Sequence, residues 1–172
     1  ITASGTYSRK LQSLLPEGSI VKAFGYSGEK TGYIGSMLSN ALKINPTDLV
    51  VLAGINDIAS GQHKNTESNL SYIYQTAKNK IPELRIVAVK LTPWRKHAER
   101  FEKKGKLLDR TEKINNWISS QQGGLVDTVV ETSSLGNEGY LIDTRDGYHP
   151  NKAGLDKLGT LIYNQAFANI RK

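Results

Sequence analysis

The fold is decided by the stretch Leu49-Val50-Val51-Leu52-Ala53-Gly54-Ile55-Asn56-Asp57. Its first five residues form a continuous apolar run, which predicts a strand covered on both faces, as in the parallel sheets of α/β proteins. Its last four residues place Asn56 and Asp57 where the strand ends. Because such sheets bind ligands beyond the carboxyl ends of their strands, this turn is a candidate functional loop.

Predicted strands and helices alternate along the rest of the chain. We expect strands at 19–24, 84–91 and 125–130, and helices at 6–15, 31–44, 66–80, 107–118 and 152–170. Thr31 and Asn151 are the expected caps of the second and the last of these helices. Repeated strand-helix units imply right-handed crossovers and a mainly parallel sheet between helical layers. The length fits one domain over residues 1–172.

Composition limits the class of protein. The chain has 38% hydrophobic and 23% charged residues and no apolar run near the ~18 residues of a membrane helix, so we expect a soluble globular protein without a membrane span. It has no cysteine, which excludes disulfides and thiolate chemistry but leaves both secreted and cytoplasmic locations open. The net charge of +7 favours anionic surroundings. The basic segment 94–106 lacks the interleaved aromatic residues of a base-stacking surface, so nucleic acid is not an expected partner.

An acid and a histidine stand close together near the end of the chain, in Asp146-Gly147-Tyr148-His149-Pro150-Asn151. On a tight turn, Asp146 can hold one ring nitrogen of His149 and leave the other free to act as a base. The alternative is a simple helix entry, with Asn151 as the cap and an incidental surface histidine. The pattern becomes more specific because the turn follows the last predicted strand, on the same edge as the turn after Ala53.

Two further groups follow strands on that edge. Gly28 lies in the loop after the first predicted strand, and its backbone N–H is a candidate donor to an oxyanion. The side-chain amide of Asn56 is a second candidate. Each has an alternative role, because Gly28 also suits a turn with positive φ and Asn56 also suits a cap. The four residues Gly28, Asn56, Asp146 and His149 together favour acyl transfer to a serine.

These residues resemble a known family. Ser27-Gly28-Glu29-Lys30-Thr31, Gly54-Ile55-Asn56-Asp57 and Asp146–Asn151 look like the second, third and fifth sequence blocks of the SGNH hydrolases, also called GDSL-type esterases and lipases. The resemblance covers essentially the whole chain. It implies a flavodoxin-like three-layer α/β/α sandwich, ester hydrolysis without a cofactor or a metal, Gly28 and Asn56 as oxyanion donors, and His149 and Asp146 as the base and its orienting acid. Asp57 would support the loop.

The family's first block is Gly-Asp-Ser, followed by residues similar to Ile1-Thr2-Ala3-Ser4-Gly5. The resemblance therefore places the nucleophilic serine, and the central strand ahead of it, directly before Ile1. We expect the domain to be incomplete at its N-terminus, with another segment carrying the nucleophile. Ser4 and Ser8 are the alternative nucleophiles, but they lie past the expected turn and inside the first expected helix.

The predicted activity is hydrolysis of short acyl esters of carbohydrate, especially O-acetyl esters, by a serine through an acyl-enzyme. The alternatives are a lipase, lysophospholipase or thioesterase of the same family, and a non-catalytic carbohydrate- or cell-wall-binding domain. Trp94 and Arg95 follow a strand on the active edge and are candidates for binding the substrate, or for surface packing. His63 and His97 have no acid at metal-ligand spacing, so no metal is expected.

Overall fold

The computed structural model describes residues 6–101 and 105–169. It divides into two compact units. The first unit comprises Ile1–Ser27, Thr92–Gly105 and Val130–Lys172, and the second comprises Gly28–Leu91 and Lys106–Val129. The expectation of one domain over the whole chain stays a prediction.

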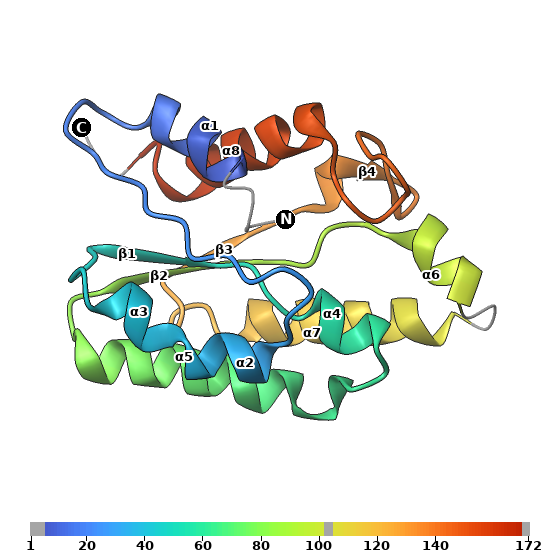
Figure 1. Cartoon of the computed structure of the whole chain (residues 1–172), viewed down its shortest axis with the longest axis horizontal. Helices are drawn as coiled ribbons and strands as arrows, with labels where there is room; N and C mark the ends of the chain where they lie inside the picture. Colours follow the sequence, from blue (N-terminus) through green and yellow to red (C-terminus); the bar gives the residue numbers. More distant parts are fainter. Residues whose placement is uncertain (1–5, 102–104, 170–172) are drawn as a thin grey trace. The chain divides into compact units, whose positions relative to one another are not determined.

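The second unit contains the predicted parallel sheet (Figure 1). Strands β1 (Asp48–Val51), β2 (Arg85–Val89) and β3 (Thr128–Val130) lie in the order β1-β2-β3, with β3 ending one residue into the first unit. β1 and β2 are parallel, and Val50 pairs with Val87. Four of the five residues of β2 are at most 1% exposed. The predicted strand at 49–53 is therefore confirmed as part of a parallel sheet, although β1 ends at Val51 and is half-buried up to Val50.

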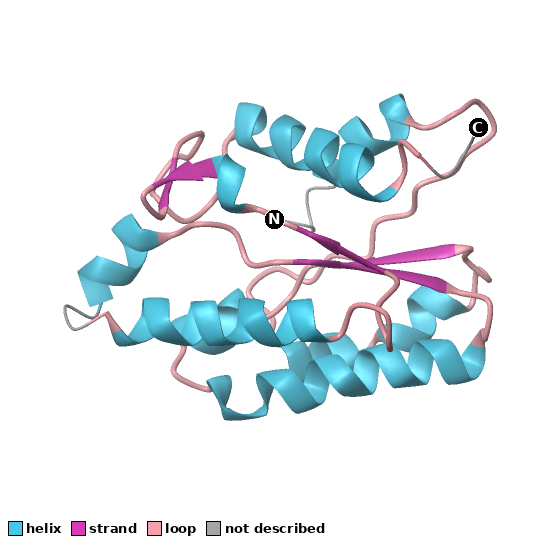
Figure 2. Ribbon diagram, turned by 180° about the vertical axis from the view of Figure 1, so that it is seen from behind, coloured by secondary structure: helices cyan, strands magenta, loops and turns pink. Residues whose placement is uncertain are grey.

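The helices of the second unit all lie on one side of this sheet (Figures 1 and 2). They are α2 (Thr31–Ser36), α3 (Leu38–Leu42), α4 (Ile55–Ala59), the 3-10 turn η1 (His63–Asn65), α5 (Thr66–Lys80) and α7 (Lys106–Ser120). The two long helices α5 and α7 confirm the predicted helices at 66–80 and 107–118. They are joined by the stacked rings of Tyr74 and Trp117, whose centroids are 6.3 Å apart.

The helix expected at 31–44 is interrupted. Met37, with φ −94° and ψ 0°, separates α2 from α3. Glycine is a poor helix former, and α2 contains Gly32 and Gly35. Gly35 also allows close packing, because a Cβ there would lie 3.3 Å from the Tyr72 ring. We expected Thr31 to cap this helix. It is instead the first residue of α2.

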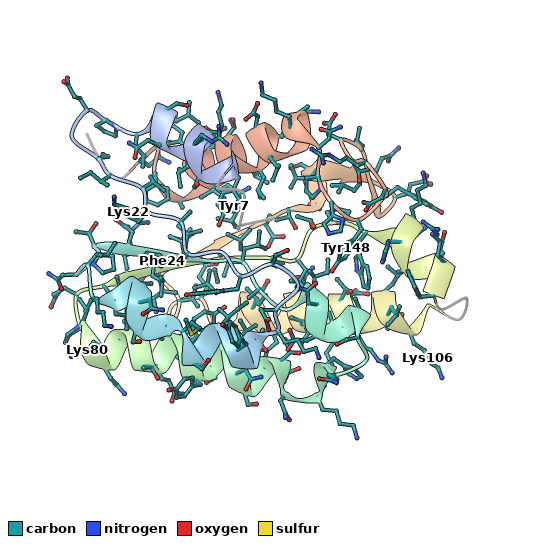
Figure 3. All side chains as sticks on the ribbon, in the orientation of Figure 1. Tyr7, Lys22, Phe24, Lys80, Lys106 and Tyr148 are labelled. Carbon is teal, nitrogen blue, oxygen red and sulfur yellow. The ribbon has the colours of Figure 1, made fainter. Side chains whose placement is uncertain are left out.

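In the first unit, α1 (Thr6–Leu14) packs against α8 (Lys152–Ala166). Gly159 makes the approach possible, since a Cβ there would lie 2.6 Å from the carbonyl oxygen of Tyr7. The Tyr7 side chain is 8% exposed, and this burial raises the pKa of its hydroxyl to about 12 (Figure 3). The unit also contains α6 (Arg95–Phe101), the 3-10 turn η2 (Ser133–Leu135) and the short antiparallel pair β4 (Gly136–Asn137) and β5 (Tyr140–Leu141).

The strand expected at 19–24 does not form. This segment is irregular, and its side chains Ile20 and Phe24 are 78% and 40% exposed; Phe24 is labelled in Figure 3. Its backbone instead bonds to a side chain, because Gln12 donates to the Ser19 carbonyl and accepts from the Val21 N–H, both at 2.7 Å. β-prone composition alone does not make a strand where the backbone has found other partners.

Candidate active site

The predicted acid and base are hydrogen bonded on one turn of the first unit. Asp146 Oδ2 lies 2.8 Å from His149 Nδ1. The other carboxylate oxygen, Oδ1, accepts the backbone N–H groups of Tyr148 and His149 at 3.0 and 2.7 Å. The carboxylate therefore fixes both the backbone and the ring of His149. With Nδ1 facing the acid, Nε2 is the nitrogen that can accept a proton from a substrate or a nucleophile.

Thr144 and Asn151 hold the two ends of this turn. The Thr144 hydroxyl accepts from the Gly147 N–H at 2.8 Å and donates to the His149 carbonyl at 2.9 Å. Asn151 caps α8 as predicted, because its side chain accepts from the Gly154 N–H at 3.0 Å. A long helix and a bridging hydroxyl thus keep the turn rigid, which catalysis by a positioned base requires.

The hydrogen bonds also set the charge of Asp146. Burial alone would raise its pKa, but the N–H groups of His149 and Tyr148 and the His149 ring outweigh burial and lower the pKa well below the usual range of a carboxyl. Asp146 is therefore ionised at neutral pH and can stabilise a protonated His149. Burial, aided by the charge of Asp146, raises the pKa of the Tyr148 hydroxyl to about 12.

Helix α6 supports the turn with residues that the sequence analysis did not select. The rings of His97 and Tyr148 are stacked with centroids 4.4 Å apart, and the Tyr148 ring meets His149 edge-on at 4.5 Å. Gly147, with φ +82°, lies against Lys96, because a Cβ there would be 2.8 Å from Lys96 Cβ. The only signal in the sequence was the spacing of Trp94 and His97, which places both on one face of a helix.

The two predicted substrate-binding residues lie beside this support. Trp94 is 1% exposed and packs against Tyr148, with ring centroids 5.6 Å apart. Arg95 is partly exposed, and its guanidinium carbon lies 5.5 Å from the centroid of the Tyr140 ring. The Trp94 side chain therefore packs in the interior of this unit, whereas the Arg95 side chain is partly exposed and can contact a ligand.

The two predicted oxyanion donors lie in the second unit. Gly28 has φ +75°, and a Cβ there would meet no atom within 4 Å. Among the described residues, nothing accepts a hydrogen bond from its N–H. Asn56 Nδ2 donates to the carbonyl of Glu29 at 2.9 Å, which ties the two loops together. The residues predicted to act together thus fall as two pairs, Gly28 with Asn56 and Asp146 with His149, one pair in each unit.

Asp57 supports these loops, as we expected. It is 2% exposed and accepts hydrogen bonds from the N–H of Thr31 at 3.0 Å and from its hydroxyl at 2.6 Å. Thr31 also accepts from Asn69 at 3.0 Å. The Thr31 hydroxyl thus donates to Asp57 and accepts from Asn69, and Lys30 takes the N-cap position of α2. Ser8 lies in α1, as expected, and Ser4 falls outside the described residues.

The sequence of this chain matches a known protein family over most of its length. Residues 2–157 match the GDSL-like Lipase/Acylhydrolase family. The chain belongs to this family. Membership supports a role as a carboxylic ester hydrolase, for which a small-molecule ester is a fitting substrate. No curated protein sequence matches the chain.

Solved structures of this family and of carbohydrate esterases share the fold. A GDSL-like lipase from Bacteroides thetaiotaomicron has a TM-score of 0.75 at 19% identity, over 95% of this chain and 82% of that one. A family 3 carbohydrate esterase from Clostridium thermocellum has a TM-score of 0.67 at 18% identity, over 94% and 85%. One from Talaromyces cellulolyticus has 0.59 at 17%, over 86% and 73%. These likenesses confirm the predicted fold class.

The described residues form neither a metal-ion cluster nor a membrane-spanning helix. In residues 6–101 and 105–169, no group of three or more His, Cys, Asp or Glu side chains is placed to hold a metal ion. No described helix has the length and apolar character needed to cross a membrane.

Proposed function

We propose that the protein is a serine-dependent ester hydrolase that acts through an acyl-enzyme on short acyl esters of carbohydrate, chiefly O-acetyl esters. The observation that carries the proposal is the 2.8 Å contact between Asp146 and His149, with the carboxylate also bonded to two backbone N–H groups. Such a pair needs a nucleophile. By the family pattern we assign this role to a serine directly before Ile1.

The proposed reaction has two steps. In the first, His149 Nε2 takes the serine proton as the hydroxyl oxygen attacks the ester carbonyl, and the alcohol leaves with that proton. The N–H of Gly28, the amide of Asn56 and the serine N–H stabilise the oxyanion. In the second step, His149 takes a proton from water, which releases the acid and restores the serine. Asp146, already ionised, stabilises the His149 imidazolium in both steps.

The choice of substrate rests on three observations. The esterases from Clostridium thermocellum and Talaromyces cellulolyticus that share this fold are named for carbohydrate. The net charge of +7 suits an acidic glycan. Arg95 is exposed enough to contact the substrate, with Trp94 fixing the adjoining turn from beneath Tyr148. These observations favour a carbohydrate as the alcohol portion of the ester.

Intact mass measured before and after treatment with a fluorophosphonate tests the proposal. The protein should be produced with the residues encoded before Ile1. We expect a mass increase of one adduct, located by peptide mapping on the serine next to Ile1, and release of acetate from acetylated oligosaccharides. Absence of an adduct together with absence of hydrolysis would refute the esterase and favour a binding domain. A preference for long acyl chains would instead indicate a lipase.

His149→Ala provides the second test. Loss of the base should lower kcat by several orders of magnitude and slow fluorophosphonate labelling, since both need an activated serine. Asn79→Ala is a control, because Asn79 is exposed near the end of α5 and has no role in the proposed site. Equal loss in the two variants would contradict the role of His149.

A further inference from the structure

A polar cavity of about 540 Å³ lies in the second unit. The starts of α2 and α5 and the connection after α4 form its walls, and Glu29, Lys30, Tyr33, Gln62, Lys64 and Asn65 are among the lining residues. Its volume is within the usual range of small-molecule sites. None of the roles assigned above uses this cavity.

The cavity adjoins the proposed oxyanion donors. Its lining residue Glu29 follows Gly28 in the chain, and the Glu29 carbonyl accepts the side-chain N–H of Asn56 at 2.9 Å. Asp57, which also lines the cavity, follows Asn56. A group bound in the cavity would therefore lie close to the two loops that carry Gly28 and Asn56.

The lining selects a polar ligand. Apart from the stems of Lys30 and Lys64, its side chains are polar or aromatic, whereas pockets for acyl chains are lined mainly by hydrophobic side chains. Gln62 and Asn65 carry amides, which both donate and accept hydrogen bonds and so match sugar hydroxyls. Tyr33 is 45% exposed and offers a ring face. Amides, a ring and ammonium groups together form a surface suited to carbohydrate.

Several of these groups are available to a ligand. Lys30 Nζ donates to Gln62 Oε1 at 2.7 Å, which positions both side chains and leaves the Gln62 NH₂ to donate. Asn65 precedes α5, but its side chain makes no capping hydrogen bond. Among the described residues, the Asn65 amide and the Lys64 ammonium have no hydrogen-bond partner. Asp57, by contrast, is fully engaged by Thr31.

From these observations we propose that the cavity is the subsite for the sugar portion of the ester substrate, with Lys64 and Asn65 as specificity-determining residues. This inference rests on the proposed function, because it assigns the alcohol side of the same reaction. The sugar hydroxyls accept from Lys64 and exchange hydrogen bonds with Asn65 and Gln62. The acyl group stays outside the cavity.

The test compares two esters that share the acetyl group. Acetylated cellotriose presents a sugar, and p-nitrophenyl acetate does not. For a double variant with Lys64→Ala and Asn65→Ala, we expect kcat/KM for acetylated cellotriose to fall roughly tenfold or more, with p-nitrophenyl acetate changed less than about twofold. The control carries Asn79→Ala and Lys80→Ala, which remove the same two side-chain types from exposed positions at the far end of α5 (Figure 3).

Each outcome decides a different question. An unchanged kcat/KM for acetylated cellotriose would overturn the inference while leaving the esterase intact, and so would equal loss on both esters. If the unmodified protein hydrolyses neither ester, the proposed function fails, and the inference is judged by binding alone. In that case, cellotriose must shift the side-chain amide NMR signals of Asn65 and Gln62, and unshifted signals would overturn the inference.

Discussion

Replacing Gly147 by alanine tests whether α6 positions the catalytic turn. Gly147 has φ +82°, in the left-handed region, where a Cβ costs about 1–2 kcal/mol. That Cβ would also lie 2.8 to 2.9 Å from Lys96 Cβ, Cγ and Cδ. Overpacking of this kind costs roughly 1–3 kcal/mol, so we expect Gly147→Ala to lower the free energy of unfolding by about 2–5 kcal/mol.

The effect on activity should be larger than stability alone explains. Gly147 lies between Asp146 and His149, and relief of the overlap moves the turn away from Lys96. A displacement near 1 Å of a catalytic group lowers kcat by about 10²-fold. Denaturant unfolding and kcat on p-nitrophenyl acetate, measured where the variant is still folded, provide the two readouts.

Two comparisons isolate the overlap from the backbone strain. Gly18→Ala is matched in backbone geometry, because Gly18 has φ +83° and open space around its Cβ position. It should cost only about 1–2 kcal/mol and leave kcat unchanged. Adding Lys96→Gly to Gly147→Ala, with Lys96→Gly as its own reference, should restore most of the lost kcat. The reasoning is refuted if Gly147→Ala behaves like Gly18→Ala in both readouts.

Three other predictions follow from the same geometry. If the Asn56 amide stabilises the oxyanion, Asn56→Ala should lower kcat by roughly 10²–10³-fold. Loss of its hydrogen bond to the Glu29 carbonyl should cost only about 1 kcal/mol of stability. An unchanged kcat would contradict the oxyanion role of Asn56. Folding lowers the pKa of Asp146, so the stabilisation by this carboxylate is present above its unfolded pKa of about 4 and is lost as the pH falls towards its folded pKa. Asp146→Asn should therefore flatten the acid limb of a plot of unfolding free energy against pH. Parallel plots for the variant and the unmodified protein would argue against this contribution. Gly159→Ala places a Cβ 2.6 Å from the Tyr7 carbonyl oxygen and 2.8 Å from Lys10 Cβ, so it should lower the Tm by pushing α1 from α8; an unchanged Tm would show that the helices are not closely packed.

Pattern in the sequence identified the elements that depend on local chemistry and burial. The apolar run 49–53 predicted β1 because continuous apolar residues are typical of parallel strands, although β1 is half-buried from Asp48 to Val50 and fully buried only at Val51. The helical period at 66–80 predicted α5 with the bounds that it has. The contact between Asp146 and His149 could also be predicted from the sequence. The two residues are three positions apart on one turn, so their contact needs no distant partner.

At two places where the prediction was wrong, a residue elsewhere in the chain had competed for the same group. Gln12 bonds to the backbone at Ser19 and Val21, so the segment at 19–24 is not a strand. Asn69 donates to the Thr31 hydroxyl oxygen, which was expected to accept a capping hydrogen bond. Neither competition is visible in local propensity, because both partners are brought in by folding.

The sequence by itself determined the α/β class, the family blocks and the acid-base pair, because each depends on residue type and short spacing. Only the tertiary structure decided what holds that pair in place. His97 and Lys96 are about fifty positions from His149 and Gly147, and their contacts arise because α6 packs on the turn. Contacts at such separation depend on how distant elements pack, which no local pattern of residues encodes.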